Sequence, residues 1–174
     1  MTTETTVALR ARPGQYLGFR MADQQYGLEI LAVQEINRNL AATPVPRMPG
    51  YVRGVVNLRG RIVPVIDLRR RLDLPAREDD AATCNIVVRV PGEEGDVTMG
   101  LVVDAVTEVH TVTEEQLSPP PEMGREVAAS FITGIARLES GIMVILDVAR
   151  LVDVSETAPA GREVTAAPGS AVTE

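Results

Sequence analysis

Short apolar runs, each broken by glycine, proline or charged residues, set the pattern of this chain. A run such as Ile142 to Leu146 has the length of a strand, and the longest runs fall well short of the roughly 20 residues that a transmembrane helix needs. Valine and isoleucine are frequent in these runs, as they are in strands. Helical spacing covers only Asp67 to Leu72 and Asp147 to Val152, where an aspartate can cap a short turn. The pattern predicts an all-β protein with short helical turns.

The expected strands fall into two sets of four. The first set is 16–21, 26–30, 52–56 and 61–68, and the second is 85–90, 99–103, 131–137 and 141–148. Pro64 stands inside one strand and cannot donate a hydrogen bond to a neighbour, so we expect it at an edge or beside a bulge.

The two sets arise from an internal repeat. Gly27 to Ile36 aligns without gaps on Gly100 to Val109, and Tyr51 to Arg70 matches Phe131 to Arg150 at a constant spacing. Antiparallel meanders of this size avoid exposed edges by curling into small barrels. The repeat therefore predicts two barrel lobes in one chain.

Composition changes mark the expected boundaries of these lobes. Lobe one is expected over about residues 15–75 and lobe two over about 84–152, and Pro75 to Ala82 is expected to be a connector of acidic and small residues between them. Residues 1–14 are expected to be a flexible leader. Residues 155–174 contain no apolar periodicity and are expected to form a disordered tail.

Charge is distributed unevenly. All 17 basic residues are arginine, and the segment from Arg38 to Arg77 carries a local balance of +7 within a chain of net charge −7. Because arginine suits bidentate recognition of carboxylates, this asymmetry favours a cationic contact face. A run of solvated surface arginines is the alternative explanation.

The side chains exclude several kinds of chemistry. A single cysteine, Cys84, precludes an internal disulfide, and a single histidine, His110, has no second His or Cys with which to share a metal. Catalytic and nucleotide-binding motifs are absent, so we expect no enzyme, cofactor or metal. The chain also has few aromatic residues and an isoelectric point near 4.8, which argues against nucleic-acid binding.

The two copies carry opposite charges at the tip of one turn. The first copy reads Asn57-Leu58-Arg59-Gly60, and the second copy has Glu139 in place of Arg59. Gly60 can supply the positive φ of a tight hairpin, which would display the side chain of Arg59. Arg53 and Arg61 nearby would extend this tip into a positive patch.

Other candidate positions stay ambiguous at this level. Glu35 is matched by Glu108 in the second copy, so its role is either structural or functional. Val33, matched by Val106, is either a core residue or an exposed apolar contact.

Taken in order, the phrases 26–36, 52–54, 57–60 and 62–68 resemble the CheW family, and 100–106, 113–117 and 131–147 agree with it. The resemblance covers about residues 15–154. It implies two intertwined SH3-like five-stranded barrels, between which strands can be exchanged. It also implies an adaptor that couples the cytoplasmic tips of methyl-accepting chemoreceptors to the regulatory domain of a CheA-type histidine kinase.

The resemblance carries over a set of candidate receptor or kinase contacts: Val33, Glu35, Arg53, Gly54, Asn57, Arg59, Gly60 and Gly100. It implies a cytoplasmic protein that is recruited to membrane receptor arrays without inserting into the membrane. The regulatory domain of the kinase itself has the same fold, and a starting methionine and polar leader favour an independent protein instead. A scaffold of a non-flagellar pathway, such as type IV pilus motility, is the alternative function.

Overall fold

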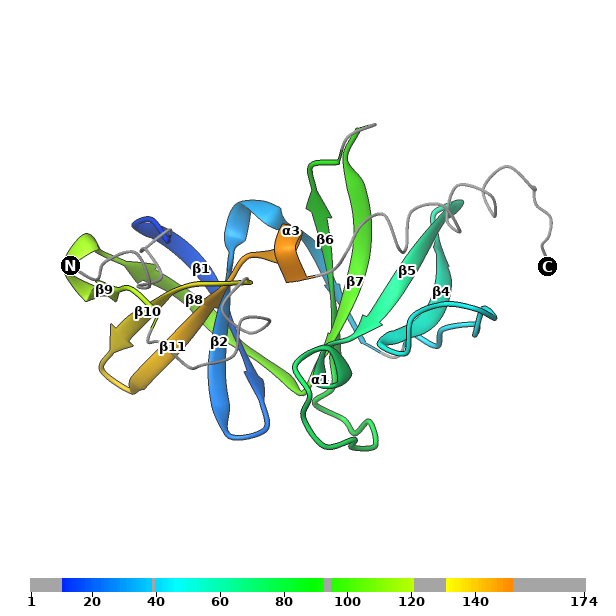
Figure 1. Ribbon diagram of the computed structural model, residues 1–174, viewed down its shortest axis with the longest axis horizontal. Coiled ribbons are helices and arrows are strands. Elements are labelled where there is room, and N and C mark those ends of the chain that lie inside the picture. Colours follow the sequence, from blue (N-terminus) through cyan, green and yellow to red (C-terminus); the bar gives the residue numbers. More distant parts are fainter. Residues whose placement is uncertain (1–10, 39, 93–94, 121–130, 152–174) are drawn as a thin grey trace, which may run out of the picture.

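The computed structural model describes residues 11–38, 40–92, 95–120 and 131–151. Within them the chain forms two β sheets that lie side by side along the long axis of the molecule (Figure 1). We call the lobe built on the six-stranded sheet lobe A and the lobe built on the five-stranded sheet lobe B. The leader expected over 1–14 lies mostly outside the described residues, and the tail expected over 155–174 lies wholly outside them.

The order of strands is the same in both lobes apart from one additional short strand. Lobe A contains, in spatial order, β8 (Ala105–Val112), β1 (Gly14–Met21), β2 (Gln24–Glu29), β11 (Gly141–Leu146), β10 (Ile132–Leu138) and β9 (Leu117–Ser118). Lobe B contains β3 (Val33–Asn37), β6 (Cys84–Val90), β7 (Val97–Val103), β5 (Arg61–Asp67) and β4 (Val52–Leu58). The sheets are two copies of one arrangement, as the internal repeat predicts.

Each sequence repeat contributes strands to both lobes. The hairpin β1–β2 belongs to lobe A, but the next strand, β3, pairs with β6 in lobe B. In the same way β6–β7 belongs to lobe B, and the following strand, β8, returns to pair with β1 in lobe A. Over the described residues the chain therefore crosses between the lobes twice, once through the 3₁₀ turn η2 (Ile30–Ala32) and once between β7 and β8. The expected lobes, 15–75 and 84–152, follow the sequence repeat, whereas the sheets divide the chain at these crossings.

Parallel pairing joins the hairpins within each lobe. β11 runs parallel to β2, and β5 runs parallel to β7. Because β5 lies between β7 and β4, the strand that contains Pro64 is internal to the sheet. Pro64 lies one residue before the β7 ladder begins at Val65, so its missing N–H falls where β7 does not pair with it.

The main hydrophobic core lies between the lobes. Phe19 and Leu28 from lobe A meet Ile86 and Leu101 from lobe B, and all four are fully buried. Two smaller clusters fill the interiors of the separate lobes. Since the largest apolar cluster is shared, burial of apolar surface holds the two lobes together.

Two helical turns follow the hairpins β4–β5 and β10–β11 and lie near the centre of the molecule (Figure 1). α1 (Leu68–Arg71) follows β5, and α3 (Val148–Leu151) follows β11 (Figure 1). The side chain of Asp67 accepts hydrogen bonds from the backbone N–H groups of residues 69 and 70, and Asp147 accepts one from residue 149. The aspartate caps expected from the sequence are confirmed.

An arginine lies where the repeated units meet. Tyr51 and Phe131, which are equivalent in the repeat, hold the guanidinium of Arg71 at 5.2 and 5.3 Å from their ring centroids. Arg71 also donates from Nε to the backbone oxygen of Leu151, its own counterpart in the second copy. Cation–π contacts and this hydrogen bond thus link lobe B to the end of α3.

Candidate functional site

The turn between β4 and β5 projects from lobe B. Arg59 and Gly60 form its two-residue loop, with φ angles of 54° and 84°. Positive φ at both positions is the pattern of a type I′ hairpin, and glycine adopts it without steric cost. The side chain of Asn57 accepts a 2.8 Å hydrogen bond from the N–H of Gly60 and fixes the loop. Asn57 and Gly60 therefore shape the turn that displays Arg59.

A carboxylate from another strand meets this arginine. Arg59 donates from one guanidinium nitrogen to Glu35 Oε1 at 3.1 Å and from the other to Glu35 Oε2. Asn37 donates to Glu35 Oε1 at 3.0 Å. Glu35 and Asn37 lie on β3, whereas Arg59 joins β4 to β5, and β3 and β4 are the two edge strands of the lobe B sheet. The ion pair therefore bridges the seam between the sheet edges.

The electrostatics of the pair favour its ionised form. Hydrogen bonds from Arg59, and then from Asn37, hold the pKa of Glu35 below its ordinary value of 4.5. The hydrogen bond to Glu35 in turn raises the pKa of Arg59. The Arg59 side chain is 75% exposed and that of Glu35 is 24% exposed, so water screens much of the attraction. Such a pair adds little to folding stability and leaves donors accessible to a partner.

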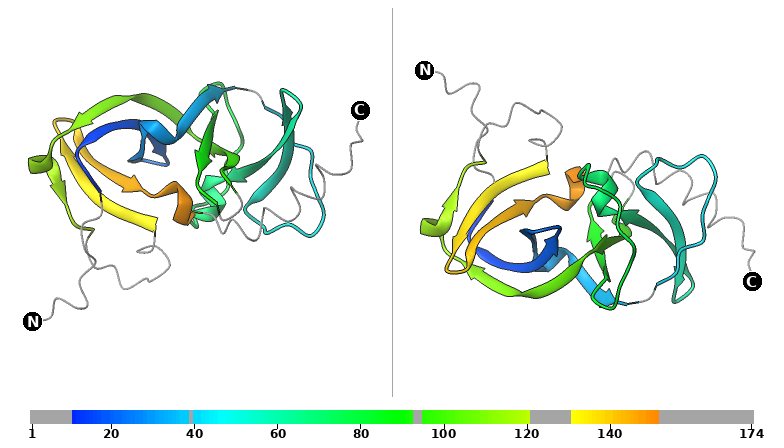
Figure 2. Two further views of the ribbon diagram at one scale, coloured as in Figure 1. Left: turned by 90° about the horizontal axis from the view of Figure 1, so that it is seen from above. Right: turned by 90° about the horizontal axis from the view of Figure 1, so that it is seen from below.

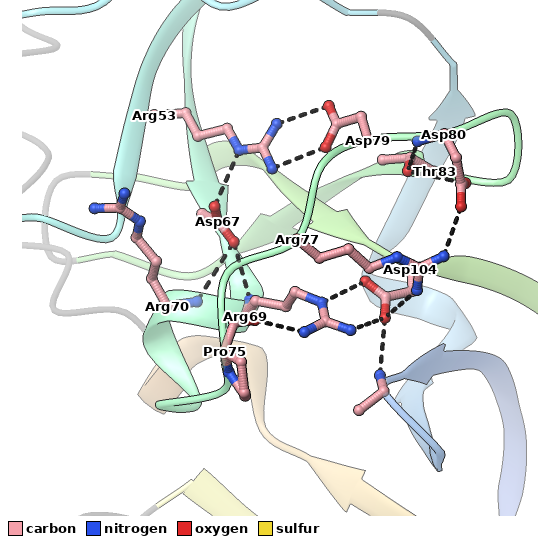
Figure 3. A network of polar contacts seen from close by, with 11 residues as sticks. Arg53, Asp67, Arg69, Arg70, Pro75, Arg77, Asp79, Asp80, Thr83 and Asp104 are labelled. Atoms are coloured by element: carbon pink, nitrogen blue, oxygen red, sulfur yellow. Dashed lines mark hydrogen bonds and ion pairs between the residues drawn. The ribbon is translucent and has the colours of Figure 1, made fainter.

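Arg53 does not extend this pair into a positive patch. Its guanidinium donates to Asp67 at 3.2 Å and to both oxygens of Asp79 at 2.9 and 3.0 Å. Figure 3 shows this arginine turned toward the connector that contains Asp79. Arg53 and Arg59 are therefore engaged by different carboxylates, and the charge of Arg53 is neutralised within the protein.

Three of the candidate residues share one transverse row of the lobe B sheet. Glu35 pairs with Val87, Val87 with Gly100, Gly100 with Val65, and Val65 with Gly54. The row crosses all five strands from β3 to β4. Residues that the sequence separates by up to 65 positions are thus brought into register.

Neighbouring atoms explain why the two positions Gly54 and Gly100 of this row are occupied by glycine. A Cβ on Gly54 would lie 2.1 Å from the backbone oxygen of Thr43, and φ at Gly54 is 149°. A Cβ on Gly100 would lie 2.4 Å from Oδ1 of Asn85. Both sites lack space for a side chain, so the need for glycine arises within lobe B. Val33, on the same edge strand as Glu35, is partly buried against the core between the lobes.

A family comparison identifies the family of the whole chain. A model described as the CheW-like domain matches residues 15–156. This chain belongs to the CheW-like family. The chemotaxis protein CheW of Rhizobium meliloti is 34% identical over 133 residues, which cover 76% of this chain and 83% of that protein. The chemotaxis protein CheW of Klebsiella aerogenes is 35% identical over 144 residues, which cover 83% of this chain and 84% of that protein.

A solved structure agrees with the CheW-like assignment. The scaffolding protein TtCheW from Thermoanaerobacter tengcongensis superposes with a TM-score of 0.74 at 33% identity, covering 83% of this chain and 95% of that one. The expected all-β fold of two intertwined SH3-like lobes is confirmed by this likeness and by the two sheets. The family is one of chemotaxis adaptors and scaffolds.

Several residues of this CheW-like chain take part in the site or its support without having been expected there. Asn37 positions Glu35, Thr43 leaves room only for glycine at position 54, and Asn85 lies against Gly100. Asn85 is 4% exposed, and neither polar atom of its side chain has a hydrogen-bond partner. Only the pairing of distant strands reveals these contacts, although a polar residue in the apolar run of β6 is a visible anomaly in the sequence.

The described part of the CheW-like domain offers no group of three or more His, Cys, Asp or Glu side chains that could hold a metal ion. Cys84 is buried. His110 lies 3.0 Å from the side-chain nitrogen of Gln25. Among the same residues, no helix is long and apolar enough to cross a membrane.

Proposed function

We propose that this CheW-like protein couples methyl-accepting chemoreceptors to a CheA-type histidine kinase, as a cytoplasmic adaptor without catalytic activity that is recruited to membrane receptor arrays. Membership of a family of chemotaxis scaffolds supports the general role. The observation that carries the specific proposal is the ion pair between the exposed Arg59 and the partly buried Glu35 at the seam of lobe B. An adaptor acts through contacts whose free energies bias its partners, and it needs no reactive group.

The position of Arg59 suits a reversible contact with a receptor or kinase. Its guanidinium is displayed on a two-residue turn whose backbone the Asn57 side chain fixes, so the loop backbone loses little conformational entropy when a partner binds. Its bond to Glu35 keeps it oriented while leaving most of the side chain exposed. A receptor or kinase carbonyl or carboxylate could accept a charge-assisted hydrogen bond from it. The structure supports this role for Arg59 and Glu35 more than for Gly54 and Gly100, whose environments explain them.

Co-sedimentation with receptor-containing membranes and a CheA-type kinase tests the proposal. Wild-type protein should carry the kinase into the pellet, and Arg59→Glu should reduce this recruitment while the barrel stays folded. Arg61→Glu, which reverses the charge of an exposed arginine two residues away, is the matched control and should retain recruitment. Normal recruitment by a folded Arg59→Glu protein would reject Arg59 as a contact.

A pull-down from native lysate addresses the choice of pathway. Recovery of a receptor and kinase of a flagellar system supports the proposal as stated, whereas recovery of components for type IV pilus motility supports the alternative pathway. Recovery of neither under conditions that preserve receptor arrays would remove the coupling function and leave the fold assignment intact.

A further inference from the structure

The two crossings between the lobes carry different residues at equivalent positions. The alignment that places Gly27 on Gly100 also places Leu31 on Asp104. Leu31 lies in the first crossing and is 95% exposed. Asp104 lies in the second crossing, between β7 and β8, and its side chain is 12% exposed. A carboxylate that is this well buried needs several donors to offset its desolvation.

Asp104 gathers such donors from both lobes (Figure 3). Arg69, on α1 of lobe B, donates to its two carboxylate oxygens at 2.9 and 2.7 Å. The backbone N–H of Ala22, in the turn between β1 and β2 of lobe A, donates at 2.8 Å. Arg77 in the connector adds a third side-chain donor at 3.1 Å. One carboxylate thereby ties lobe A, lobe B and the connector together.

The connector is fastened on either side of this point. Arg77 also donates to Asp80 at 2.5 Å, and Arg69 donates to the backbone oxygen of Pro75 at 2.5 Å. Farther along, Asp79 accepts from Arg53 on β4. Figure 3 shows the connector lying across α1 and the end of β5 through these contacts. The segment between the sequence repeats is therefore part of the ionic network.

The equivalent place in the second copy is built differently. Arg69 corresponds to Ala149, just as Asp104 corresponds to Leu31. Neither alanine nor leucine can form an ion pair. The pseudo-symmetric molecule thus has an ionic connection at one crossing and an apolar, exposed residue at the other.

We propose that Asp104, Arg69 and Arg77 form an electrostatic clamp that fixes the orientation of lobe A relative to lobe B, and that Asp104 is a positioning residue for coupling. This inference rests on the proposed function, because an adaptor that contacts two partners must hold its contact surfaces in a defined relation. Arg59 and Glu35 lie on lobe B, and six strands of the molecule lie in lobe A. A change in lobe orientation would move any contact on lobe A relative to that pair.

The geometry of the clamp, as well as its strength, restricts the orientation of the two lobes. Arg69 presents two nitrogens to one carboxylate, a bidentate arrangement that restricts rotation as well as distance. Asp104→Asn keeps the size of the side chain and an oxygen for Ala22, but removes the negative charge that holds the two arginines. The apolar core between the lobes remains, so the variant should stay folded with a less restricted orientation.

Residual dipolar couplings of backbone amides measure this orientation directly. In wild type, couplings from lobe A and lobe B should fit one alignment tensor calculated from this structure. In Asp104→Asn the couplings of the two lobes should no longer fit one tensor. Each lobe should require its own tensor, or the tensor of one lobe should be reduced in magnitude. Asp96→Asn is the matched control, because Asp96 forms an exposed 3.9 Å ion pair with Arg89 inside lobe B alone. If Asp104→Asn gives the wild-type tensor, the clamp is rejected.

Co-sedimentation with receptor membranes and kinase tests the link to coupling. Asp104→Asn should lower the apparent affinity on the order of 5- to 150-fold, the usual range for energetic coupling between sites. Adding Arg69→Gln should cost little more, because both changes remove the same interaction. A changed tensor with unchanged recruitment would overturn the positioning role.

Two further results keep the test decisive if Asp104→Asn does not fold or if the wild type recruits no kinase. If Asp104→Asn does not fold, Arg77→Gln removes only the more exposed arm of the clamp, and it should shift the tensor in the same direction by a smaller amount. If wild-type protein itself recruits no kinase, the proposed function fails, while the dipolar couplings still accept or reject the clamp.

Discussion

Replacing Gly100 by alanine tests whether this position acts through the fold or through a partner. The added Cβ would lie 2.4 Å from Oδ1, 2.9 Å from Nδ2 and 3.0 Å from Cγ of Asn85. Contact between heavy atoms is favourable only near 3.5–4.0 Å, so the Asn85 amide must move by roughly 1 Å. Asn85 is 4% exposed, which leaves the amide little room to move.

The expected magnitude follows from opposing effects. Overpacking of a core costs about 1–3 kcal/mol. Alanine in a strand regains about 0.5–1 kcal/mol relative to glycine. We therefore expect Gly100→Ala to lower the free energy of unfolding by about 0–2.5 kcal/mol, or up to roughly 10 °C in Tm for a protein of this size.

A double-mutant cycle with Asn85→Ala isolates the contact. Asn85→Ala removes the obstructing amide, so Gly100→Ala in that background should be neutral or stabilising by about 0.5–1 kcal/mol. Urea unfolding measures all four proteins, and the expected coupling between the two changes is about 1–3 kcal/mol. Additive effects would refute the steric explanation. Receptor and kinase recruitment by the double variant then shows whether Gly100 has any role beyond making room for Asn85.

Three more predictions concern other parts of lobe B and its junction. Gly54→Ala should cost about 2 kcal/mol or more in urea unfolding, because its Cβ would meet the immobile backbone oxygen of Thr43 at a strained φ; a loss smaller than that of Gly100→Ala would contradict this. Arg71→Met should lower stability by about 1–2 kcal/mol through two lost cation–π contacts, and calorimetry showing an unchanged Tm would argue against them. The carboxyl of Glu35 should titrate below pH 4.5 by NMR and shift upward in Arg59→Ala. Since the folded pKa is depressed, the stability from this pair is present above pH 4.5 and is lost as pH falls through the folded pKa, and a midpoint at or above 4.5 would disprove the interaction.

The sequence predicted most strands because each is encoded locally. The eight expected strands are present, with ends within two residues of those observed. β3, β8 and β9 were not among the expected strands. β3 and β8 are the strands that leave one lobe to pair in the other, and the partner of a strand depends on distant residues that a local pattern does not contain.

In the candidate site, too, local features could be predicted and contacts between distant residues could not. The displayed turn at Arg59 could be predicted because Gly60 follows directly. Its partner Glu35 could not be assigned, since the pair forms only when β3 reaches the seam of lobe B. The positive patch with Arg53 was overestimated for a related reason, because Asp79 is separated from Arg53 by 26 residues and folds back to neutralise it.

Differences between the two copies explain how a nearly symmetric molecule can present unequal faces. At the seam of lobe B, Arg59 meets Glu35, whereas the equivalent positions in lobe A are Glu139 and Glu108, which cannot form an ion pair with each other. Lobe A closes its corresponding region with an additional strand, β9, paired to β10. The shared fold therefore fixes the strand order in both lobes, while charge at a few positions outside the repeated core distinguishes one lobe from the other. A partner that recognises arginine at a hairpin tip would find that feature on lobe B and a glutamate at the matching tip of lobe A, which gives the adaptor a defined polarity.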